Sequence, residues 1–299
     1  MESVTKFHSL DEAITTLFGE HVHIVSKRPV FGGDINQSYR VSLSDGTAVF
    51  MKTNLPQNLS FFQAEEVGLK ALRKTGTIGV PQALGIGIDE AQGISFLLLE
   101  YLVSAPKSST YWEVFGRELA RMHRADCTVN GEKMFGFPSD NYIGASVQIN
   151  TPKRDWISFF RECRLLPQIR MADGHLDSGM RKQCIKLLDR LDSYLIVPEF
   201  PSLLHGDLWS GNAICGPDGK AWILDPAVYI GYFEAELAMT ELFGGYRDSF
   251  YQAYHEVNPI DSGYRDRRDL YNLYHMLNHL NLFGGSYWNS VRRILNRYV

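Results

Sequence analysis

The chain lacks the features of a membrane-spanning or secreted protein. No stretch approaches the roughly 18 apolar residues of a transmembrane helix, and the nearest candidate, residues 94–102, contains Ser95 and Glu100. Residues 1–20 show no basic segment followed by an apolar one, so we expect no signal peptide. The sequence has only four cysteines, and none forms a Cys-x-x-Cys pair. We therefore expect free thiols and a cytoplasmic location.

A strong excess of either charge is also missing. The 299 residues include 30 Lys and Arg against 34 Asp and Glu, a net charge of −4. Nucleic-acid-binding proteins usually carry a basic surplus, so we expect no nucleic-acid partner and no membrane partner. Apolar residues make up 44% and charged residues 21%, as in ordinary globular proteins. The length allows two lobes, each with its own core.

The first hundred residues have the patterns of a β-rich unit. Residues 36–43 and 46–53 predict two strands, joined by the Ser-Asp-Gly turn between them. A segment with helical spacing of its apolar residues follows over about 60–72. Residues 94–101 then form a continuous apolar run that predicts another strand.

The pattern becomes helical after residue 103. Residues 104–109 form a polar linker, and apolar residues then recur three and four positions apart in long segments. These segments lie around residues 112–122, 187–194 and 270–280. We infer an α+β fold class with a β-rich N-lobe over residues 1–103 and a mainly helical C-lobe over residues 104–299.

A glycine-rich segment lies just before the first predicted strand of the N-lobe. Phosphoryl transfer requires mainly positioning and charge neutralisation from a protein. The backbone amides of Gly32 and Gly33, with Asn36 after them, are candidates to hold phosphate groups, because glycine lets the backbone approach an anion. A Gly-Gly turn between strands is the alternative interpretation.

Lys52 lies in the second predicted strand and would point away from the face that carries Val49 and Met51. An ammonium group among apolar neighbours needs a partner. Glu65 on the following helix is the candidate, although Glu66 is adjacent to it. The pair would hold the nucleotide phosphates. The alternative is a lysine that reaches solvent from a strand edge.

The run His-Gly-Asp-Leu-Trp-Ser-Gly-Asn over residues 205–212 carries the strongest signal. Asp207 precedes Asn212 by five residues, the spacing of a kinase catalytic loop in which the Asp accepts a hydroxyl proton and the Asn binds Mg²⁺. Gly206 stands where most protein kinases have Arg. This difference favours a small-molecule kinase.

Asp225 is the candidate second magnesium ligand. It follows the apolar run 221–224, which comes after a turn at residues 216–219. Such a hairpin would return Asp225 to the vicinity of Asn212. An Asp before Pro is otherwise a common turn former. The spacing relative to Asn212 favours the ligand interpretation.

Two C-terminal features have simpler explanations. His275 and His279 have metal-ligand spacing, but the residues between them lack the Glu of a zinc site, which favours packing or hydrogen bonding. Several aromatic residues would suit a sugar or amine pocket, although this spacing is more often that of a core. They are Tyr271, Tyr274, Tyr287 and Trp288.

These motifs together resemble the fructosamine-3-kinase and ketosamine kinase family, in the aminoglycoside-phosphotransferase-like branch of the protein-kinase-like superfamily. The segment Asp-Asn-Tyr-Ile-Gly at 140–144, Trp209 and the C-terminal residues 273–285 are the parts most typical of that family. The similarity covers nearly the whole chain. It implies a bilobal protein-kinase-like fold, with a nucleotide-binding antiparallel sheet and one key helix in the N-lobe.

The resemblance also implies an activity, namely ATP-dependent phosphorylation of a ketosamine on the 3-hydroxyl of its sugar, which promotes deglycation. Asp207 would be the base and Lys52–Glu65 the nucleotide-positioning pair, and the expected cofactors are ATP and Mg²⁺. The backbone of Glu100 and Leu102 would contact adenine, and Asn212 and Asp225 would hold the metal. Glu236 stands where related kinases often carry an Asp that braces the catalytic loop. The partner would be a small-molecule or protein-bound ketosamine, and a monomer is expected.

Two other functions stay open on the sequence. One is a different phosphotransferase of the superfamily, acting on aminoglycosides, choline or homoserine. The other is a non-catalytic nucleotide-binding module. Such modules usually lose the lysine, the base or a metal ligand, whereas this chain keeps all of these residue types.

Overall fold

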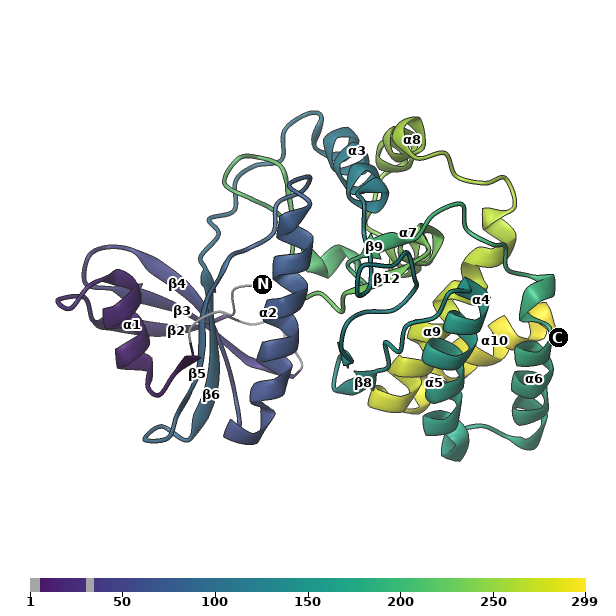
Figure 1. Ribbon diagram of the computed structural model, residues 1–299, viewed down its shortest axis with the longest axis horizontal. Coiled ribbons are helices and arrows are strands. Elements are labelled where there is room, and N and C mark those ends of the chain that lie inside the picture. The colour runs from purple at the N-terminus through teal and green to yellow at the C-terminus, as the bar shows by residue number, and fades with distance from the viewer. Residues whose placement is uncertain (1–5, 31–34) are drawn as a thin grey trace. The chain divides into compact units, whose positions relative to one another are not determined.

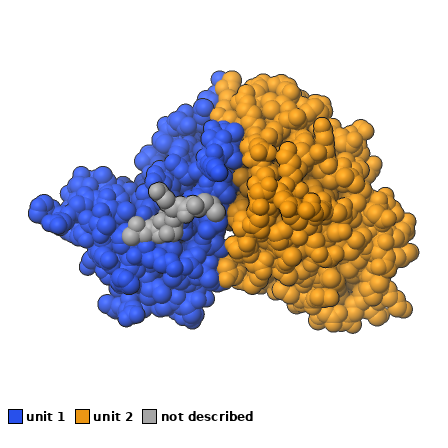
Figure 2. Space-filling model, viewed as in Figure 1, with its two compact units in different colours: residues 1–109, 214–224 blue, residues 110–213, 225–299 orange. Residues whose placement is uncertain are grey.

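The computed structural model describes residues 6–30 and 35–299 (Figure 1). The chain divides into two compact units (Figure 2). The first takes in the residues up to 109 together with 214–224, and the second consists of 110–213 and 225–299. Each unit is described here by itself.

The first unit is built on a six-stranded mixed sheet. Its strand order is β1-β5-β6-β4-β3-β2, in which β1 and β5 run parallel and the other neighbours run antiparallel. The strands are β1 (Lys6–Phe7), β2 (Ile24–Val30), β3 (Gln37–Leu43), β4 (Ala48–Asn54), β5 (Ala83–Asp89) and β6 (Ile94–Glu100). The strands predicted over 36–43, 46–53 and 94–101 are therefore confirmed to within two residues.

Two helices cover opposite faces of this sheet (Figure 1). Helix α1 (Leu10–Phe18) packs on the face that carries Val49 and Met51 and forms the apolar core there. Helix α2 (Leu59–Lys74) lies on the other face, against β5 and β6. Because side chains alternate along a strand, Lys52 points toward the α2 face, as predicted.

A hairpin from late in the sequence completes the first unit. Strands β10 (Ala213–Cys215) and β11 (Ala221–Ile223) pair with each other, and Trp222 forms a β-bridge with Gly79. A Cβ atom on Gly79 would lie 2.5 Å from the Trp222 ring, so only glycine allows this approach. Sequence analysis placed the hairpin among residues 104–299, because nothing local reveals its contact with a segment so far back in the chain.

The second unit is mainly helical. Its helices are α3 (Tyr111–Arg124), α4 (Trp156–Phe159), α5 (Leu166–Met171), α6 (Ser178–Asp189), α7 (Phe233–Leu242), α8 (Asp248–Val257), α9 (Tyr264–Phe283) and α10 (Trp288–Tyr298). Two short antiparallel strand pairs accompany them, β7 (Asn141–Ile143) with β8 (Ser146–Gln148) and β9 (Ser202–Leu204) with β12 (Tyr229–Gly231). Short 3₁₀ turns occur in this unit at Ala172–His175, Leu191–Ser193, Ser210–Asn212 and Gly285–Tyr287, and Phe160–Leu165 is a π-helical turn. The first unit has a 3₁₀ turn at Pro56–Asn58.

Helix α3 packs closely along α8. A Cβ atom on Gly116 would lie 2.2 Å from the backbone oxygen of Phe250, so the missing side chain sets the close spacing. The predicted helices near 112–122 and 270–280 are confirmed as α3 and α9. The predicted segment 187–194 is wrong in part, because α6 ends at Asp189 and the backbone tightens into a 3₁₀ turn.

Among the described residues, no helix is both long and apolar enough to cross a membrane. All four cysteines are free thiols. Three of them are buried, namely Cys163, Cys184 and Cys215.

Candidate active site

A buried ion pair joins β4 and α2 in the first unit. Lys52 Nζ lies 2.6 Å from Glu65 Oε1, and the two side chains are only 6% and 11% exposed. Glu66 pairs instead with Lys70 on its own helix, at 2.7 Å. The structure therefore selects Glu65 as the partner and contradicts a lysine that reaches solvent from a strand edge. Because both charged groups are largely shielded from water, each holds the other in position.

The remaining predicted nucleotide contacts also belong to the first unit. Gly32 and Gly33 lie outside the described residues. Asn36 is described, and its Oδ1 accepts a hydrogen bond from Asn54 Nδ2 at 2.7 Å, which fixes it beside the end of β4. Glu100 is the last residue of β6 and Leu102 follows two residues later. Their contacts with adenine stay a prediction.

The catalytic-loop candidates belong to the second unit, in the segment that follows β9. Asn212 Nδ2 donates to the backbone oxygen of Asp207 at 2.8 Å and to its Oδ2 at 3.2 Å. Burial raises the pKa of Asp207 well above its usual value, and the charge of Asp225 adds to this rise, against the hydrogen bond from Asn212. The structure thus brings Asp207, Asn212 and Asp225 together. Two neighbouring carboxylates that repel each other favour a cation between them.

The chain leaves the second unit just after Asn212 and returns to it at Asp225. The excursion is the β10–β11 hairpin, so the hairpin predicted between the two residues is confirmed. Asp225 has a φ of 57°, a left-handed conformation that is rare outside glycine. Such outliers cluster at functional sites, where the surrounding structure holds them in place.

Position 206 requires glycine for a structural reason that the sequence did not reveal. Its φ is +86°, and a Cβ atom there would lie 2.0 Å from the backbone oxygen of Ala227. Ala227 N donates to the oxygen of His205 at 2.8 Å, so the two segments are bonded at the point of contact. The absence of a side chain at 206 therefore lets the Asp207 and Asp225 segments lie against each other.

Replacing Gly206 by Ala should lower both stability and activity. The left-handed conformation costs an L-residue about 1–2 kcal/mol, and the collision with Ala227 adds about 1–3 kcal/mol. We expect the free energy of unfolding, measured by urea denaturation, to fall by about 2–5 kcal/mol. The matched control is Gly174→Ala, where a Cβ atom would meet open space. Wild-type stability in the Gly206 variant would contradict this account of the loop.

Glu236 on α7 braces the same loop through hydrogen bonds to its backbone. Its Oε1 accepts from Gly206 N at 2.7 Å, and its Oε2 accepts from His205 N at 2.9 Å. His123 Nε2, on α3, lies 2.9 Å from the same Oε2. Burial alone would raise the pKa of Glu236, but the hydrogen bond and charge of His123, with a smaller contribution from His205, hold it below its usual value. The longer Glu thus fills the bracing position that the sequence assigned to it.

The comparisons with known proteins agree with this geometry. The family model described as fructosamine kinase matches residues 6–299. The chain belongs to the fructosamine kinase family. A probable ketoamine kinase of Synechocystis is 40% identical over 304 residues, covering 99% of this chain and 98% of the relative. A chloroplastic protein-ribulosamine 3-kinase of Arabidopsis thaliana is 39% identical over 284 residues, covering 94% of this chain and 85% of the relative.

Solved structures show the same fold. A candidate fructosamine-3-kinase of Thermobifida fusca is 34% identical with a TM-score of 0.83, covering 98% of this chain and 99% of that one. The choline kinase LicA of Streptococcus pneumoniae is 15% identical with a TM-score of 0.60, covering 97% of each chain, and so shows the fold alone. The predicted bilobal, protein-kinase-like α+β class is confirmed. As a member of the fructosamine kinase family, the protein is an ATP-dependent phosphotransferase that acts on a hydroxyl group.

An aromatic strip lies beside the loop at residues 205–212, and sequence reasoning missed one member of it, Phe243. Trp209, 37% exposed, meets Phe243, 44% exposed, with ring centroids 6.2 Å apart. His279 contacts Phe243 at 5.4 Å and Tyr287 at 5.0 Å. Phe243 lies just before Gly244-Gly245, and this exposed aromatic residue at a helix end was the available signal.

The other aromatic and histidine candidates are packing residues. Tyr271 and Tyr274 are 1% and 3% exposed and belong to the core. His279 Nδ1 lies 2.7 Å from the backbone oxygen of His275, which is the hydrogen bonding expected for this pair. Burial lowers the pKa of His275 to about 3, so its ring is neutral. Among the described residues, no cluster of three or more His, Cys, Asp or Glu side chains could hold a metal ion.

Proposed function

We propose that the protein transfers the γ-phosphoryl group of ATP to the 3-hydroxyl of the sugar in a ketosamine. The observation that carries the proposal is the hydrogen bond between Asp207 and Asn212, with the charge of Asp225 beside it and Glu236 holding the backbone of the loop, in a chain of the fructosamine kinase family. The Arabidopsis relative is named a protein-ribulosamine 3-kinase, which supports the substrate class. Phosphate at that position labilises the adduct and frees the amine, so the outcome would be deglycation.

The residues of the site divide the work. Asp207 orients the substrate hydroxyl and accepts its proton as the phosphoryl group is transferred. Asn212 and Asp225 would hold Mg²⁺, since amide and carboxylate oxygens are the ligands it accepts. The ion would neutralise charge on the phosphate oxygens. The repulsion between the Asp207 and Asp225 carboxylates supports a cation there.

The first unit supplies the nucleotide contacts in this proposal. The ammonium group of Lys52, fixed by Glu65, neutralises the α- and β-phosphates. The backbone at Gly32, Gly33 and Asn36 holds the phosphates. The backbone at two further positions, Glu100 and Leu102, receives adenine.

The aromatic strip around Trp209 supports a substrate with apolar faces and polar edges. Aromatic rings provide rigid contact area for such molecules at little cost in conformational entropy. We propose that Trp209 contacts the ketosamine, either free or attached to a protein. A cytoplasmic location and a monomeric state stay predictions from the sequence.

Substrate turnover tests the proposal. We expect ATP consumption with ribulosyl-lysine and fructosyl-lysine but not with kanamycin or choline. Phosphorus NMR of the products would place the new phosphate on the 3-hydroxyl. Turnover with only kanamycin or choline would overturn the substrate class while leaving the kinase chemistry intact. Phosphate on another hydroxyl would overturn the site of attack.

A further inference from the structure

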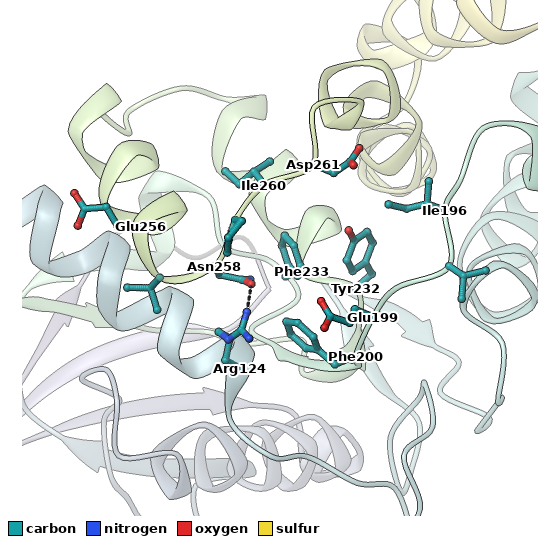
Figure 3. A pocket seen from close by; sticks show the side chains of 13 residues that line it. Arg124, Ile196, Glu199, Phe200, Tyr232, Phe233, Glu256, Asn258, Ile260 and Asp261 are labelled. Atoms are coloured by element: carbon teal, nitrogen blue, oxygen red, sulfur yellow. Dashed lines mark hydrogen bonds between the residues drawn. The ribbon is translucent and has the colours of Figure 1, made fainter.

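The second unit contains a pocket lined by none of the residues to which a role in phosphoryl transfer has been given. It lies among the end of α3, the segment before β9, the start of α7 and the segment after α8 (Figure 3). Its volume is about 650 Å³, within the range of roughly 300–1,000 Å³ typical of small-molecule sites. Phe200, Phe233 and Ile260 supply apolar walls.

Four charged side chains line this pocket, and two of them are neutralised within the protein. Glu256 Oε2 lies 2.8 Å from Arg117 Nη2, and Asp261 Oδ1 lies 2.8 Å from Arg267 Nη2. Glu199 forms no hydrogen bond or ion pair with any other described residue, and no ion pair joins it to Arg124 across the pocket. The exposed Glu199 carboxylate and the remaining donors of the exposed Arg124 guanidinium are therefore available to a ligand.

Arg124 is held in place by two contacts. Its Nη1 donates to Asn258 Oδ1 at 3.0 Å, the dashed line in Figure 3. Its guanidinium carbon lies 4.9 Å from the centre of the Phe200 ring, which in turn stacks on Phe233 at 6.1 Å. A guanidinium has five N–H donors, so a fixed Arg124 keeps donors for an anionic group.

We propose that this pocket binds a free amino acid with a large apolar side chain. The α-carboxylate of the ligand would accept hydrogen bonds from Arg124, its α-ammonium would pair with Glu199, and its side chain would lie against Phe200 and Phe233. A simple cation or anion would leave one of the two protein charges without a partner. A zwitterion with an apolar group pairs with both charges and also packs against the apolar walls.

The pocket connects to the catalytic loop through a chain of hydrogen bonds. Asn258 Nδ2 donates to the Tyr254 hydroxyl at 2.9 Å, and that hydroxyl lies 2.7 Å from His123 Nδ1. His123 Nε2 in turn lies 2.9 Å from Glu236 Oε2, so the chain of contacts ends at the brace. Asn258, Tyr254 and His123 are all at most 1% exposed. A carboxylate that accepts from the remaining donors of Arg124 pulls on the guanidinium and on Asn258, which is bonded to it, and so acts on the brace of the loop.

Calorimetric titration of the full chain with L-phenylalanine tests the site. We expect 2-phenylethylamine and 3-phenylpropionate, which each lack one charge, to bind at least about tenfold more weakly, since a charged hydrogen bond is lost. The variants Arg124→Met and Glu199→Gln should each weaken phenylalanine binding about tenfold. The control Arg121→Met removes an exposed Arg from the same helix and should bind as wild type. Absence of phenylalanine binding to the wild type, or wild-type affinity in either pocket variant, would overturn the proposal.

Turnover tests the connection to the loop, with whichever acceptor hydroxyl the enzyme uses. Saturating phenylalanine should change kcat of the wild type at least about twofold, a coupling at the low end of the usual range. Tyr254→Phe should bind phenylalanine normally but lose this response, because its hydroxyl is the middle of the chain. A wild-type kcat that does not change on phenylalanine binding, or a full response in Tyr254→Phe, would overturn the connection. Both tests are independent of which ketosamine is the substrate.

Discussion

Asp207→Asn should lower the rate of phosphoryl transfer by about 10²–10⁴-fold while ATP binding stays close to wild type. The amide has nearly the shape of the carboxylate but does not accept the substrate proton. Asn212 would still find an oxygen at position 207, because it also donates to the backbone carbonyl of Asp207. Single-turnover kinetics would measure the chemical step, and nucleotide titration would measure binding.

The distinction between rate and binding identifies the role of Asp207. Replacement of a metal ligand, the role proposed for Asp225, should instead weaken magnesium-dependent nucleotide binding along with the rate. Asp192→Asn, on an exposed 3₁₀ turn of the same unit, is the matched control and should behave as wild type. Turnover retained by Asp207→Asn would refute the assignment of the base.

Glu236→Gln should disturb the catalytic loop without touching any group that reacts. The side-chain amide offers one oxygen and an NH₂ group, so a buried backbone N–H of His205 or Gly206 would face another donor. A buried donor without an acceptor costs about 1–3 kcal/mol. Where the NH₂ group takes the place of Oε2, it faces His123 as well as His205 N. We expect the free energy of unfolding to fall by about 3 kcal/mol, and kcat by about 10²-fold through misplacement of Asp207.

The pH dependence of this variant separates the charge of Glu236 from its shape. The pKa of Glu236 in the folded protein lies below the ordinary value of 4.5. Its contribution to stability is therefore fully present above about pH 4.5 and is lost as pH falls through the folded value. The difference in unfolding free energy between wild type and Glu236→Gln should shrink below pH 4.5. A difference that stays constant down to pH 3 would contradict the brace, and the exposed Glu20→Gln serves as the control.

Local patterns predicted much of the fold and the core of the site. Alternation in β4 placed Lys52 opposite Val49, and the spacing of Asp207 and Asn212 with a hairpin before Asp225 brought the three side chains together. These features depend on residues close in sequence, whose geometry follows from strand pleat and turn length. Glu65 rather than Glu66 pairs with Lys52, because the face of the helix that carries Glu65 meets the sheet.

Other parts of the site depend on contacts between distant segments. The need for glycine at 206 arises from Ala227, and the brace joins Glu236 to His123 from another helix. The pairing of His123 with Tyr254 requires α3 to lie close to α8. Amino-acid type alone did not indicate these distances. The neutralised and unpaired charges of the Arg124 pocket were invisible in the sequence for the same reason.

The late position of the β10–β11 hairpin has a consequence for synthesis of the protein. A ribosome-bound chain that ends before Trp222 has all six strands of the main sheet but not the partner of Gly79. The first unit therefore stays incomplete until its last two strands have been translated. Trp222 Nε1 donates to Asp218 at 3.1 Å within the hairpin itself, so this segment has local contacts of its own before it docks. Completion of the first unit and closure of the interval between Asn212 and Asp225 are thus one event in folding.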